Sequence, residues 1–395
     1  MDNRRVVVKF GGSDLSSGER VRKAAEMILK AGFREVVVVV SAMGETTNNL
    51  IGVISQIGEI SDQDYADILS MGERTSARIF CAALKALGAD AVYIEPSHEE
   101  WPIITDLNFK DAKPDTEETR KRVEKYLEPL LLSGKIVVVC GFLGKNKHGN
   151  ITTLGRGGSD TTALLLANCL RADEVILVKE TEGVLSADPK IVPDARILET
   201  VDIYEMFALA HGGAKVIKAE SLKYKLPNQK LKVVSFSSGD LRSHGTEILG
   251  VFNSNSFEIR EEKGLAAVSL ICPIGADTMS QIFAAFSGSK ICGVSTGKGT
   301  ITIFVSTDML KDLISRLHSL EICKAISCLT KVGLVEISHP IFVDSPGWVA
   351  KIANALSSKG INIIEIATSK ATINIFIDEV KIEEAVKVVR DALET

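Results

Sequence analysis

The first two thirds of the chain alternate between short apolar runs and amphipathic segments. Apolar runs predict buried strands at 6–10, 36–40, 90–95, 136–141, 174–179 and 231–236. Apolar residues spaced by three or four positions predict helices at about 18–31, 47–58, 62–87, 117–133, 160–171, 202–210 and 214–226. Strands that alternate with helices usually form a mostly parallel sheet covered on both faces. This part of the chain is therefore predicted to be α/β.

The rhythm changes after a small, polar stretch at 252–256. From 265 to 317 the pattern predicts strand, helix, strand, strand, helix, and the same order returns from 334 to 393. A repeat at a separation of about 70 residues indicates a duplicated ferredoxin-like unit. The second copy lacks the closing strand that the first is predicted to have at about 322–329. The alternating segment 257–262 is predicted to supply it, because an uncovered sheet edge is a liability.

Composition narrows the class of protein. The 395 residues carry a formal net charge of −5 and show no basic stripe of the kind that binds nucleic acid. No apolar run reaches the ~18–20 residues of a membrane span, and the early first strand argues against a signal peptide. The seven cysteines include no C-x-x-C pair, which is typical of a reducing compartment. We expect a cytoplasmic protein that binds neither nucleic acid nor membranes.

The strongest chemical signal is the stretch Gly155-Arg156-Gly157-Gly158-Ser159-Asp160, which opens the predicted helix 160–171. Glycine lets a backbone approach a ligand closely, and N–H groups at a helix start attract anions. Arginine can hold a carboxylate or phosphate through two parallel hydrogen bonds. Asp160 stands where a helix cap would stand, but capping explains neither Arg156 nor the glycines. The stretch predicts a binding site for a small anion.

A second signal of the same kind lies at the first strand. Lys9 ends a buried run and is followed closely by Gly11 and Gly12. Lysines are rarely buried without a partner, whereas ligands bind at the carboxyl ends of strands in open α/β sheets. The segment is not a P-loop, because no Gly-Lys-Ser/Thr closes the turn. Six scattered histidines include no H-E-x-x-H, so no metal site of the protein's own is predicted.

Several motifs, in order along the whole chain, resemble those of aspartate kinases: Lys9-Phe10-Gly11-Gly12-Ser13, Ser41-Ala42-Met43, Gly72-Glu73-Arg74, Thr152-Thr153-Leu154-Gly155-Arg156-Gly157-Gly158-Ser159-Asp160, Ala187-Asp188-Pro189 and Gly213-Ala214-Lys215-Val216. The resemblance implies an amino-acid kinase domain at 1–252 and two ACT domains at 257–331 and 332–395. It implies ATP- and Mg²⁺-dependent phosphorylation of the side-chain carboxylate of L-aspartate, the entry to lysine, threonine, methionine and isoleucine synthesis.

The resemblance also implies roles for individual residues. The catalytic set would be Lys9, Asp160 and Lys215. Aspartate would be bound by Ser41, Thr47, Glu73, Phe142, Arg156 and Ser159, with Glu73 on its α-ammonium group and Arg156 on its α-carboxylate. The nucleotide would contact Lys9, Gly11, Gly12, Ser13, Lys179, Glu180, Leu185, Lys190 and Lys215.

The chain departs from the family pattern at the nucleotide end. Lys179-Glu180 stands where the family usually has Thr-Asp, and Lys218-Ala219 stands where it commonly has His-Pro. Lys179 adds a positive charge near the expected phosphates, and Glu180 is one methylene longer than aspartate. The departures put the nucleotide preference in question, although the transfer chemistry need not change.

Regulation is predicted at the second repeat. In ACT units an effector amino acid usually binds the loop after the first strand, opposite an asparagine on the next strand. The second repeat keeps this pattern as Asp344, Ser345, Pro346 and Gly347, followed by Asn362, whereas the first repeat lacks the Pro-Gly. The resemblance implies a feedback amino acid, lysine or threonine, and a homodimer or larger homo-oligomer formed through the ACT units.

Other interpretations stay open. Singly, Ser41 and Thr47 read better as turn and cap residues, and Glu73 as part of a solvated helix face. A kinase of the same fold could use another acceptor, such as a glutamate-type, carbamate or uridylate substrate. The fold could also serve as a silent amino-acid sensor, although retention of Lys9, Asp160 and Lys215 argues against it.

Overall fold

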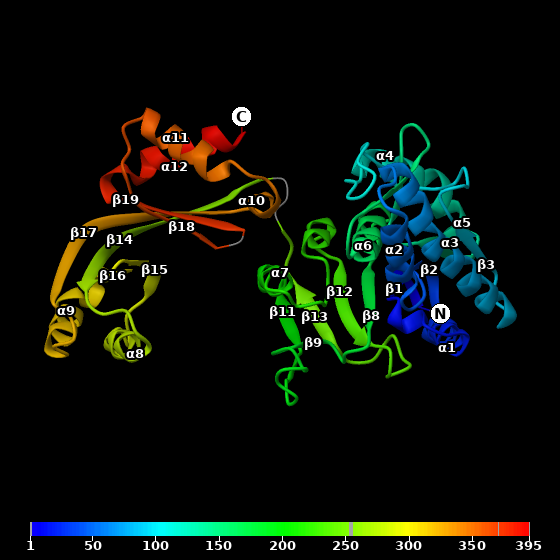
Figure 1. The fold of residues 1–395 in the computed structure, drawn as a ribbon, viewed down its shortest axis with the longest axis horizontal. Helices are drawn as coiled ribbons and strands as arrows, with labels where there is room; N and C mark the ends of the chain where they lie inside the picture. Colours follow the sequence, from blue (N-terminus) through cyan, green and yellow to red (C-terminus); the bar gives the residue numbers. More distant parts are fainter. Residues whose placement is uncertain (1, 253–255, 370, 395) are drawn as a thin grey trace. The chain divides into compact units, whose positions relative to one another are not determined.

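A computed structural model describes residues 2–252, 256–369 and 371–394, and it divides into two compact units, Met1–Phe252 and Asn253–Thr395 (Figure 1). The first unit is built on an eight-stranded sheet in the order β11-β13-β12-β8-β1-β2-β5-β3. Its strands are β1 (Asp2–Phe10), β2 (Phe33–Val40), β3 (Ala91–Ile94), β5 (Ile136–Cys140), β8 (Glu174–Lys179), β11 (Thr200–Asp202), β12 (Lys230–Ser235) and β13 (Thr246–Leu249). All six strands predicted from apolar runs are confirmed to within a few residues.

The helices of this unit cover both faces of the sheet. From β1 to β3 the chain moves in one direction across the sheet, and from β3 to β12 it moves back. Because crossovers between parallel strands are right-handed, the two groups of helices lie on opposite faces. The first group is α1 (Gly18–Ala31), α2 (Thr46–Ile57) and α3 (Asp62–Ala86); the second is α4 (Thr116–Arg122), α5 (Glu128–Leu132), α6 (Gly158–Cys169) and α7 (Ile203–His211).

Two helix predictions need correction. The helix predicted at 214–226 is only a 3₁₀ segment, η3 (Ala219–Tyr224), because Gly212 and Gly213 end α7 and the chain runs through turns to Lys218. The helix predicted at 117–133 is interrupted by a π-helical turn, η2 (Val123–Leu127), between α4 and α5. The spacing of apolar residues reveals neither change. It does not detect the turns at 212–218, and a π turn inserts one residue without ending the helix.

The unit also carries smaller pieces: η1 (Ser13–Leu15), a three-stranded sheet of β4 (Ile104–Thr105), β6 (Leu143–Asn146) and β7 (Ile151–Thr153), and a hairpin of β9 (Val184–Leu185) and β10 (Ile197–Leu198). The strands β1, β2, β5 and β8 are parallel neighbours. Their buried stretches are runs of valine, isoleucine and leucine, as expected for strands covered on both faces. Their carboxyl ends therefore lie side by side, and this edge positions the site described below.

The second unit is a six-stranded antiparallel sheet in the order β15-β16-β14-β17-β19-β18. Its strands are β14 (Glu258–Ile271), β15 (Ile291–Gly297), β16 (Thr300–Ser306), β17 (Ala325–Ser338), β18 (Ile363–Ser369) and β19 (Thr372–Asp378). Its helical segments are α8 (Ala276–Ala285), η4 (Thr307–Met309), α9 (Leu310–Ser319), α10 (Ile341–Asp344), α11 (Trp348–Ser358), η5 (Glu379–Lys381) and α12 (Ile382–Glu394).

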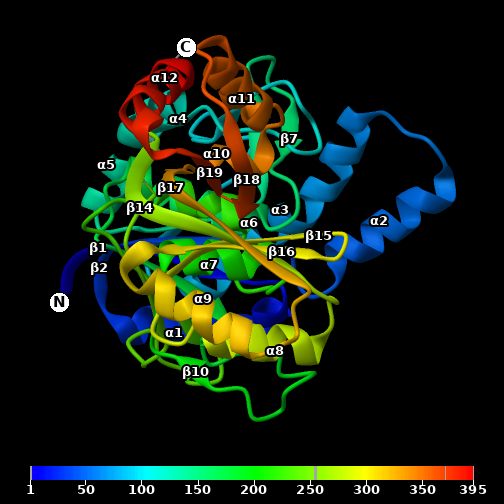
Figure 2. The ribbon, with the colours of Figure 1, turned by 90° about the vertical axis from the view of Figure 1, so that its left-hand side faces the viewer.

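Two long strands run through both repeats of this unit. Residues 258–262 of β14 pair with 334–338 of β17, and residues 265–271 of β14 pair with 325–332. The closing strand expected at 322–329 is thus continuous with the first strand of the second repeat. Figures 1 and 2 show α8 and α9 beside one half of the long strands and α11 and α12 beside the other. The rings of Phe304 and Phe376 stack with their centroids 3.7 Å apart and join the two halves of the sheet.

Candidate active site

Three charged side chains meet where β1 and β8 end. Lys9, at the end of β1, is 6% exposed, and its Nζ lies 3.0 Å from Oδ1 of Asp160. Lys179, the last residue of β8, brings its Nζ to 3.4 Å from the same oxygen. The second carboxylate oxygen of Asp160 accepts a hydrogen bond of 3.1 Å from the Lys218 backbone N–H. The cluster thus holds two ammonium groups around one buried carboxylate.

The electrostatics of this cluster favour a net positive charge. Burial alone would raise the pKa of Asp160, but Lys179 and Lys9 together lower it to about 2. Burial lowers the pKa of Lys179 to about 8, aided by the neighbouring Lys9 and opposed by Asp160. Asp160 is therefore an anion throughout the physiological range. One carboxylate cannot balance two lysines, so the cluster attracts further anions, of which the neighbouring Asp14 is one.

The Gly155–Gly158 loop leads directly into α6. Gly157 is the residue before the helix, with φ of 75°, and Asp160 lies in the first turn. The expectation that Asp160 stands at the cap position is therefore wrong, and its carboxylate faces the lysines instead. A Cβ on Gly157 would lie 2.9 Å from Cβ of Lys218. Both the left-handed backbone and this contact require glycine.

Lys218 is a site residue that the sequence analysis did not assign. Its Nζ donates to the Leu154 carbonyl at 2.9 Å and lies 3.9 Å from Oδ1 of Asp111. Its stem packs along Gly157, and its backbone N–H holds Asp160. Lys218 therefore ties the glycine loop to the buried aspartate. The resemblance to aspartate kinases marked position 218 only as a departure from the family pattern. It could not reveal the contacts of Lys218, because they join segments about sixty residues apart.

Asp14 is a second unassigned group. It is buried in η1, and its Oδ2 accepts the Gly11 N–H at 2.7 Å. Burial raises its pKa to about 6, although the Gly11 hydrogen bond and Lys9 oppose the shift. Its Oδ1 is buried without a hydrogen-bond partner among the described residues. Asp14 thus places a partly satisfied carboxyl group beside the lysine cluster.

A second group of predicted residues gathers at the carboxyl ends of β2 and β5. Ser41, just after β2, donates its Oγ–H to Oγ of Ser159 at 3.0 Å. Glu73 on α3 is 3% exposed, and its Oε1 accepts the Ala42 N–H at 3.1 Å. Its Oε2 has no partner in the described structure. Burial raises the pKa of Glu73 to about 7, so the solvated-face interpretation of Glu73 is wrong.

The remaining aspartate-site candidates lie on three separate segments: after β5, in α2 and in the glycine loop. Phe142 follows β5 in a left-handed conformation, with φ of 66°, and its N–H donates to Oγ1 of Thr162 at 3.1 Å. A non-glycine residue in that region is strained and worth notice. Thr47 is half-buried in the first turn of α2. Arg156 is exposed, and no partner of its guanidinium is recorded among the described residues.

The nucleotide-site candidates are less tightly gathered. Glu180 is exposed and paired with Arg20, whose guanidinium lies 4.3 Å from the centre of the Phe236 ring. Lys215 is exposed in the turns after α7, and in the described residues it makes no recorded contact with the lysine cluster. The other candidates are found as follows: Gly11 and Gly12 next to Asp14, Ser13 exposed in η1, Leu185 half-buried in β9, and Lys190 exposed in the loop after β9.

The predicted effector loop borders a cavity in the second unit. Ser345, Pro346 and Gly347 line a space of about 720 Å³ together with the aromatic residues Phe342 and Trp348. The side chain of Asp344 lies outside the described part of the structure. Asn362 is exposed just before β18 and does not line this cavity.

Neither a metal cage nor a membrane helix is found among the described residues. Within residues 2–252, 256–369 and 371–394, no group of three or more His, Cys, Asp or Glu side chains could hold a metal ion. In the same part of the chain, none of the helices has both the length and the apolar character needed to cross a bilayer.

Comparison with known proteins shows the family of this chain. Residues 4–234 match the model of the amino acid kinase family, and residues 327–391 match an ACT domain. The aspartokinase of Mycolicibacterium smegmatis is 31% identical over 98% of this chain and 95% of its own length. This chain belongs to the aspartokinases. The aspartokinase of Pseudomonas aeruginosa is likewise 31% identical, over 98% of this chain and 97% of its own.

Solved structures support the same fold for this aspartokinase. The aspartate kinase of Synechocystis aligns with a TM-score of 0.74 and 26% identity, over 99% of this chain and 70% of that one. Aspartokinase III of E. coli, solved with aspartate and ADP, aligns with a TM-score of 0.58 and 21% identity, over 99% and 100%. The predicted fold, an amino-acid kinase domain followed by ACT domains, is confirmed.

Proposed function

We propose that this chain transfers the γ-phosphoryl group of ATP to the side-chain carboxylate of L-aspartate. The observation that carries the proposal is the juxtaposition, in an aspartokinase fold, of a cationic cluster with a buried carboxylate. The cluster of Lys9, Asp160 and Lys179 suits phosphate groups. The free Oε2 of Glu73 suits an ammonium group.

The chemistry demands little covalent help from the protein. An aspartate side chain is ionised at pH 7 and already nucleophilic, so no general base is needed. One of its oxygens attacks the γ-phosphorus, the bond to the β,γ-bridging oxygen breaks, and ADP leaves. The main obstacle is repulsion between two anions, which positioned cations remove. Lys9 and Lys179 would supply that charge, and Asp160 would hold both ammonium groups in place.

Aspartate would be oriented by groups at the other end of the site. Glu73 would accept hydrogen bonds from its α-ammonium group, and Arg156 would hold its α-carboxylate in a bidentate pair. Ser41, Ser159, Thr47 and Phe142 would shape the space between them. Such positioning converts a bimolecular encounter into a nearly unimolecular step.

The nucleotide end requires a choice among the predicted residues. Gly11 and Gly12 would offer backbone amides to the phosphates, and Mg²⁺ bound to ATP would neutralise part of their charge. The buried Asp14, whose Oδ1 has no hydrogen-bond partner among the described residues, would suit that ion as an oxygen ligand. The other proposed nucleotide contacts do not meet at the lysine cluster and would close around ATP when it binds. They are Ser13, Glu180, Leu185, Lys190 and Lys215.

The acceptor and donor can be tested together. ADP release should require both ATP and L-aspartate, and should be at background level with L-glutamate or without an acceptor. GTP in place of ATP measures donor choice, and the same comparison in a Lys179→Thr/Glu180→Asp variant measures the effect of these two residues on it. Activity with L-glutamate equal to that with L-aspartate would reject the proposed substrate, and no ADP release under any condition would support a silent sensor.

The second unit would serve regulation and assembly. We infer that residues 257–331 and 332–395 act as two interlaced ACT domains, joined by the pairing of β14 with β17. E. coli aspartokinase III has been solved with lysine and aspartate, and lysine or threonine is the proposed effector here, in the cavity beside Ser345–Gly347. Removal of residues 257–395 should abolish dimerisation and any feedback inhibition while kinase activity remains. Light scattering and inhibition curves measure both, and a truncated chain that remains dimeric would place the contact elsewhere.

A further inference from the structure

A salt bridge beside the nucleotide-site candidates was not predicted from the sequence. Arg20, in the first turn of α1, pairs its Nη2 with Oε1 of Glu180. Glu180 directly follows Lys179, which ends β8 and belongs to the lysine cluster. The pair therefore connects α1, the helix that follows Gly11, Gly12 and η1, to the strand that ends at the proposed phosphate site.

An aromatic ring holds Arg20 in place. The guanidinium carbon lies 4.3 Å from the centre of the Phe236 ring, and Phe236 is 2% exposed. Phe236 directly follows β12, and its N–H donates to the Lys179 carbonyl at 2.7 Å. The Nε of Arg20 is buried and has no hydrogen-bond partner among the described residues. Because a cation is attracted to the face of an aromatic ring, the guanidinium is positioned beside the ends of β8 and β12.

The negative charge of Glu180 reaches the lysine cluster. Burial raises the pKa of the neighbouring Asp14 to about 6, and Glu180 adds to that rise. Within the described part of the chain, Arg20 is the ion-pair partner recorded for Glu180. Charges of like sign within ~10 Å of each other are only partly screened at ~0.1 M salt. Without Arg20, Glu180 would therefore repel phosphate groups at the lysine cluster.

Folding does not account for the pair. The side chains of Arg20 and Glu180 are 31% and 50% exposed, and exposed ion pairs contribute little to stability. A glutamate beside a phosphate site is unfavourable for binding unless its charge is offset. A role at the nucleotide site explains the pair better than a role in stability.

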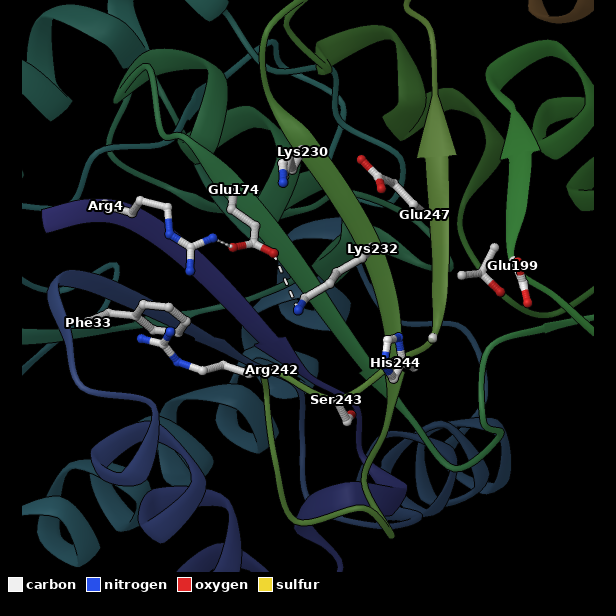
Figure 3. A pocket seen from close by; sticks show the side chains of 12 residues that line it. Arg4, Phe33, Glu174, Glu199, Lys230, Lys232, Arg242, Ser243, His244 and Glu247 are labelled. Carbon is white, nitrogen blue, oxygen red and sulfur yellow. Dashed lines mark hydrogen bonds and ion pairs between the residues drawn. The ribbon is translucent and has the colours of Figure 1, made fainter. Parts of the chain in front are cut away.

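The opposite ends of the same strands give a contrast. There Glu174 pairs with Arg4, and its other oxygen lies 3.4 Å from Nζ of Lys232, in a cavity of about 600 Å³ (Figure 3). Lys232 also stands opposite Glu247 on the neighbouring strand β13. These groups offset one another, so nothing shown there favours an anion. At the carboxyl ends, the proposed nucleotide brings several negative charges, which an unpaired Glu180 would oppose.

We propose that Arg20 is a positioning residue of the nucleotide site, which holds Glu180 and offsets its charge so that the phosphates of ATP bind at the lysine cluster. The inference rests on the proposed kinase function, and more narrowly on its nucleotide site. Arg20 acts through Glu180 and not by contact with the nucleotide. The pairing explains how Glu180, one methylene longer than aspartate, is accommodated beside the phosphates.

Calorimetric titration of the full chain with Mg·ADP tests the inference without depending on the acceptor. Arg20→Met keeps an unbranched side chain on the Phe236 ring but removes the charge. It should raise the ADP Kd roughly five- to tenfold at ~0.1 M salt, because the charge of Glu180 is then uncompensated. At ~1 M salt, where the Debye length is ~3 Å, the ratio of the variant Kd to the wild-type Kd should fall to about two or less. A merely structural role for Arg20 would not give this salt dependence.

A second background shows whether Arg20 acts through Glu180. In a Glu180→Gln chain the repulsion is absent, so Arg20→Met should change the ADP Kd by no more than about twofold. If Arg20 bound the phosphates itself, its loss would have the same effect in both backgrounds. In kinetic assays, Arg20→Met should raise the ATP KM while the aspartate KM stays within about twofold of its wild-type value.

Arg22→Met is the matched control. It removes an arginine of the same helix, 69% exposed and paired with Glu26, and should leave the ADP Kd unchanged. Arg20→Gln, which keeps a hydrogen-bond donor without the charge, replaces Arg20→Met if that variant does not fold. Equal Kd values for the Arg20 and Arg22 variants, or the same loss with and without Glu180→Gln, would overturn the inference alone. Absence of ADP binding by the wild-type chain would overturn it together with the nucleotide site on which it rests.

Discussion

The two ends of the candidate active site differ in how far they are assembled. At the phosphoryl end, Lys9, Lys179 and Asp160 are already paired, with Lys9 and Asp160 buried and Lys179 half-buried, and the Lys218 N–H completes the cluster. At the aspartate end, one oxygen of Glu73 has no hydrogen-bond partner in the described part of the chain, and Arg156 is exposed. In the proposed mechanism, charge for the transition state is therefore pre-organised, whereas the proposed aspartate-binding groups would obtain their partners from the substrate.

The largest effect should come from breaking the pre-organised end. Lys9→Ala should reduce kcat by a factor of about 100–1,000, because an oriented charge at a transition state typically contributes ~3–4 kcal/mol. Steady-state kinetics with saturating aspartate and ATP measures it. Lys23→Ala, which removes a lysine of α1 that contacts Phe236 rather than Asp160, is the control. A Lys9→Ala enzyme with wild-type kcat would reject the mechanism.

The aspartate end should respond through binding. Arg156→Ala should raise the aspartate KM by about tenfold or more with a smaller change in kcat, because the α-carboxylate has the same charge before and during the transfer. The ATP KM should change little. Equal effects on the aspartate KM and the ATP KM would mean that the Gly155–Gly158 loop acts on the whole site and that the two ends are not distinct.

Lys218 connects the two ends, and its removal tests how rigid that connection is. Lys218→Met keeps the stem beside Gly157 but removes the hydrogen bond to the Leu154 carbonyl. Because the backbone N–H still holds Asp160, we expect an aspartate KM raised by roughly five- to tenfold at nearly constant kcat. Lys218→Arg should restore most of the affinity. A loss confined to kcat would contradict a positioning role at the glycine loop.

The pH dependence should separate the ends by smaller factors. Glu73, whose pKa is raised to about 7 by burial, becomes neutral below that pH and can no longer attract an ammonium group. For aspartate, kcat/KM should therefore fall as the pH drops below about 7. Lys179, whose pKa is lowered to about 8, loses its charge above that pH, and kcat/KM for ATP should fall there.

Two variants assign these limbs of the pH profile. Glu73→Gln should lower the affinity for aspartate and remove its acid limb. Lys179→Arg should move the alkaline limb for ATP upward, because arginine keeps its charge. The profiles of kcat/KM for aspartate and for ATP should be measured from pH ~5.5 to ~9.5. Finding the same limb for both substrates would contradict the separation of the two ends.

The sequence predicted the parts of the site that follow directly from strand ends. Lys9 was predicted from the end of a buried apolar run. Ser41, Phe142 and Lys179 came from the family resemblance, and they too follow or end a strand, where parallel strands bring such positions together. Family resemblance supplied the acceptor and the likeness of the second unit to ACT domains. Both depend on motifs whose spacing is read along the chain.

The remaining parts depend on contacts that no local pattern encodes. Lys218 was hidden in a segment that looked helical, because periodicity does not detect the turns that replace the helix. The raised pKa of Asp14 and Glu73 follows from burial, which tertiary packing alone determines. The pairing of β14 with both halves of β17 was not predicted as such. The sequence predicted only that the second repeat lacks a closing strand and that residues 257–262 supply it.

Trapping the product with hydroxylamine tests the central claim most directly. An acyl phosphate formed on the aspartate side chain reacts with hydroxylamine to give β-aspartyl hydroxamate, which can be identified by mass. We predict that the wild-type chain forms this compound only with both ATP and L-aspartate, and that Lys9→Ala forms almost none. ADP release from the wild-type chain without any aspartyl hydroxamate would contradict the account.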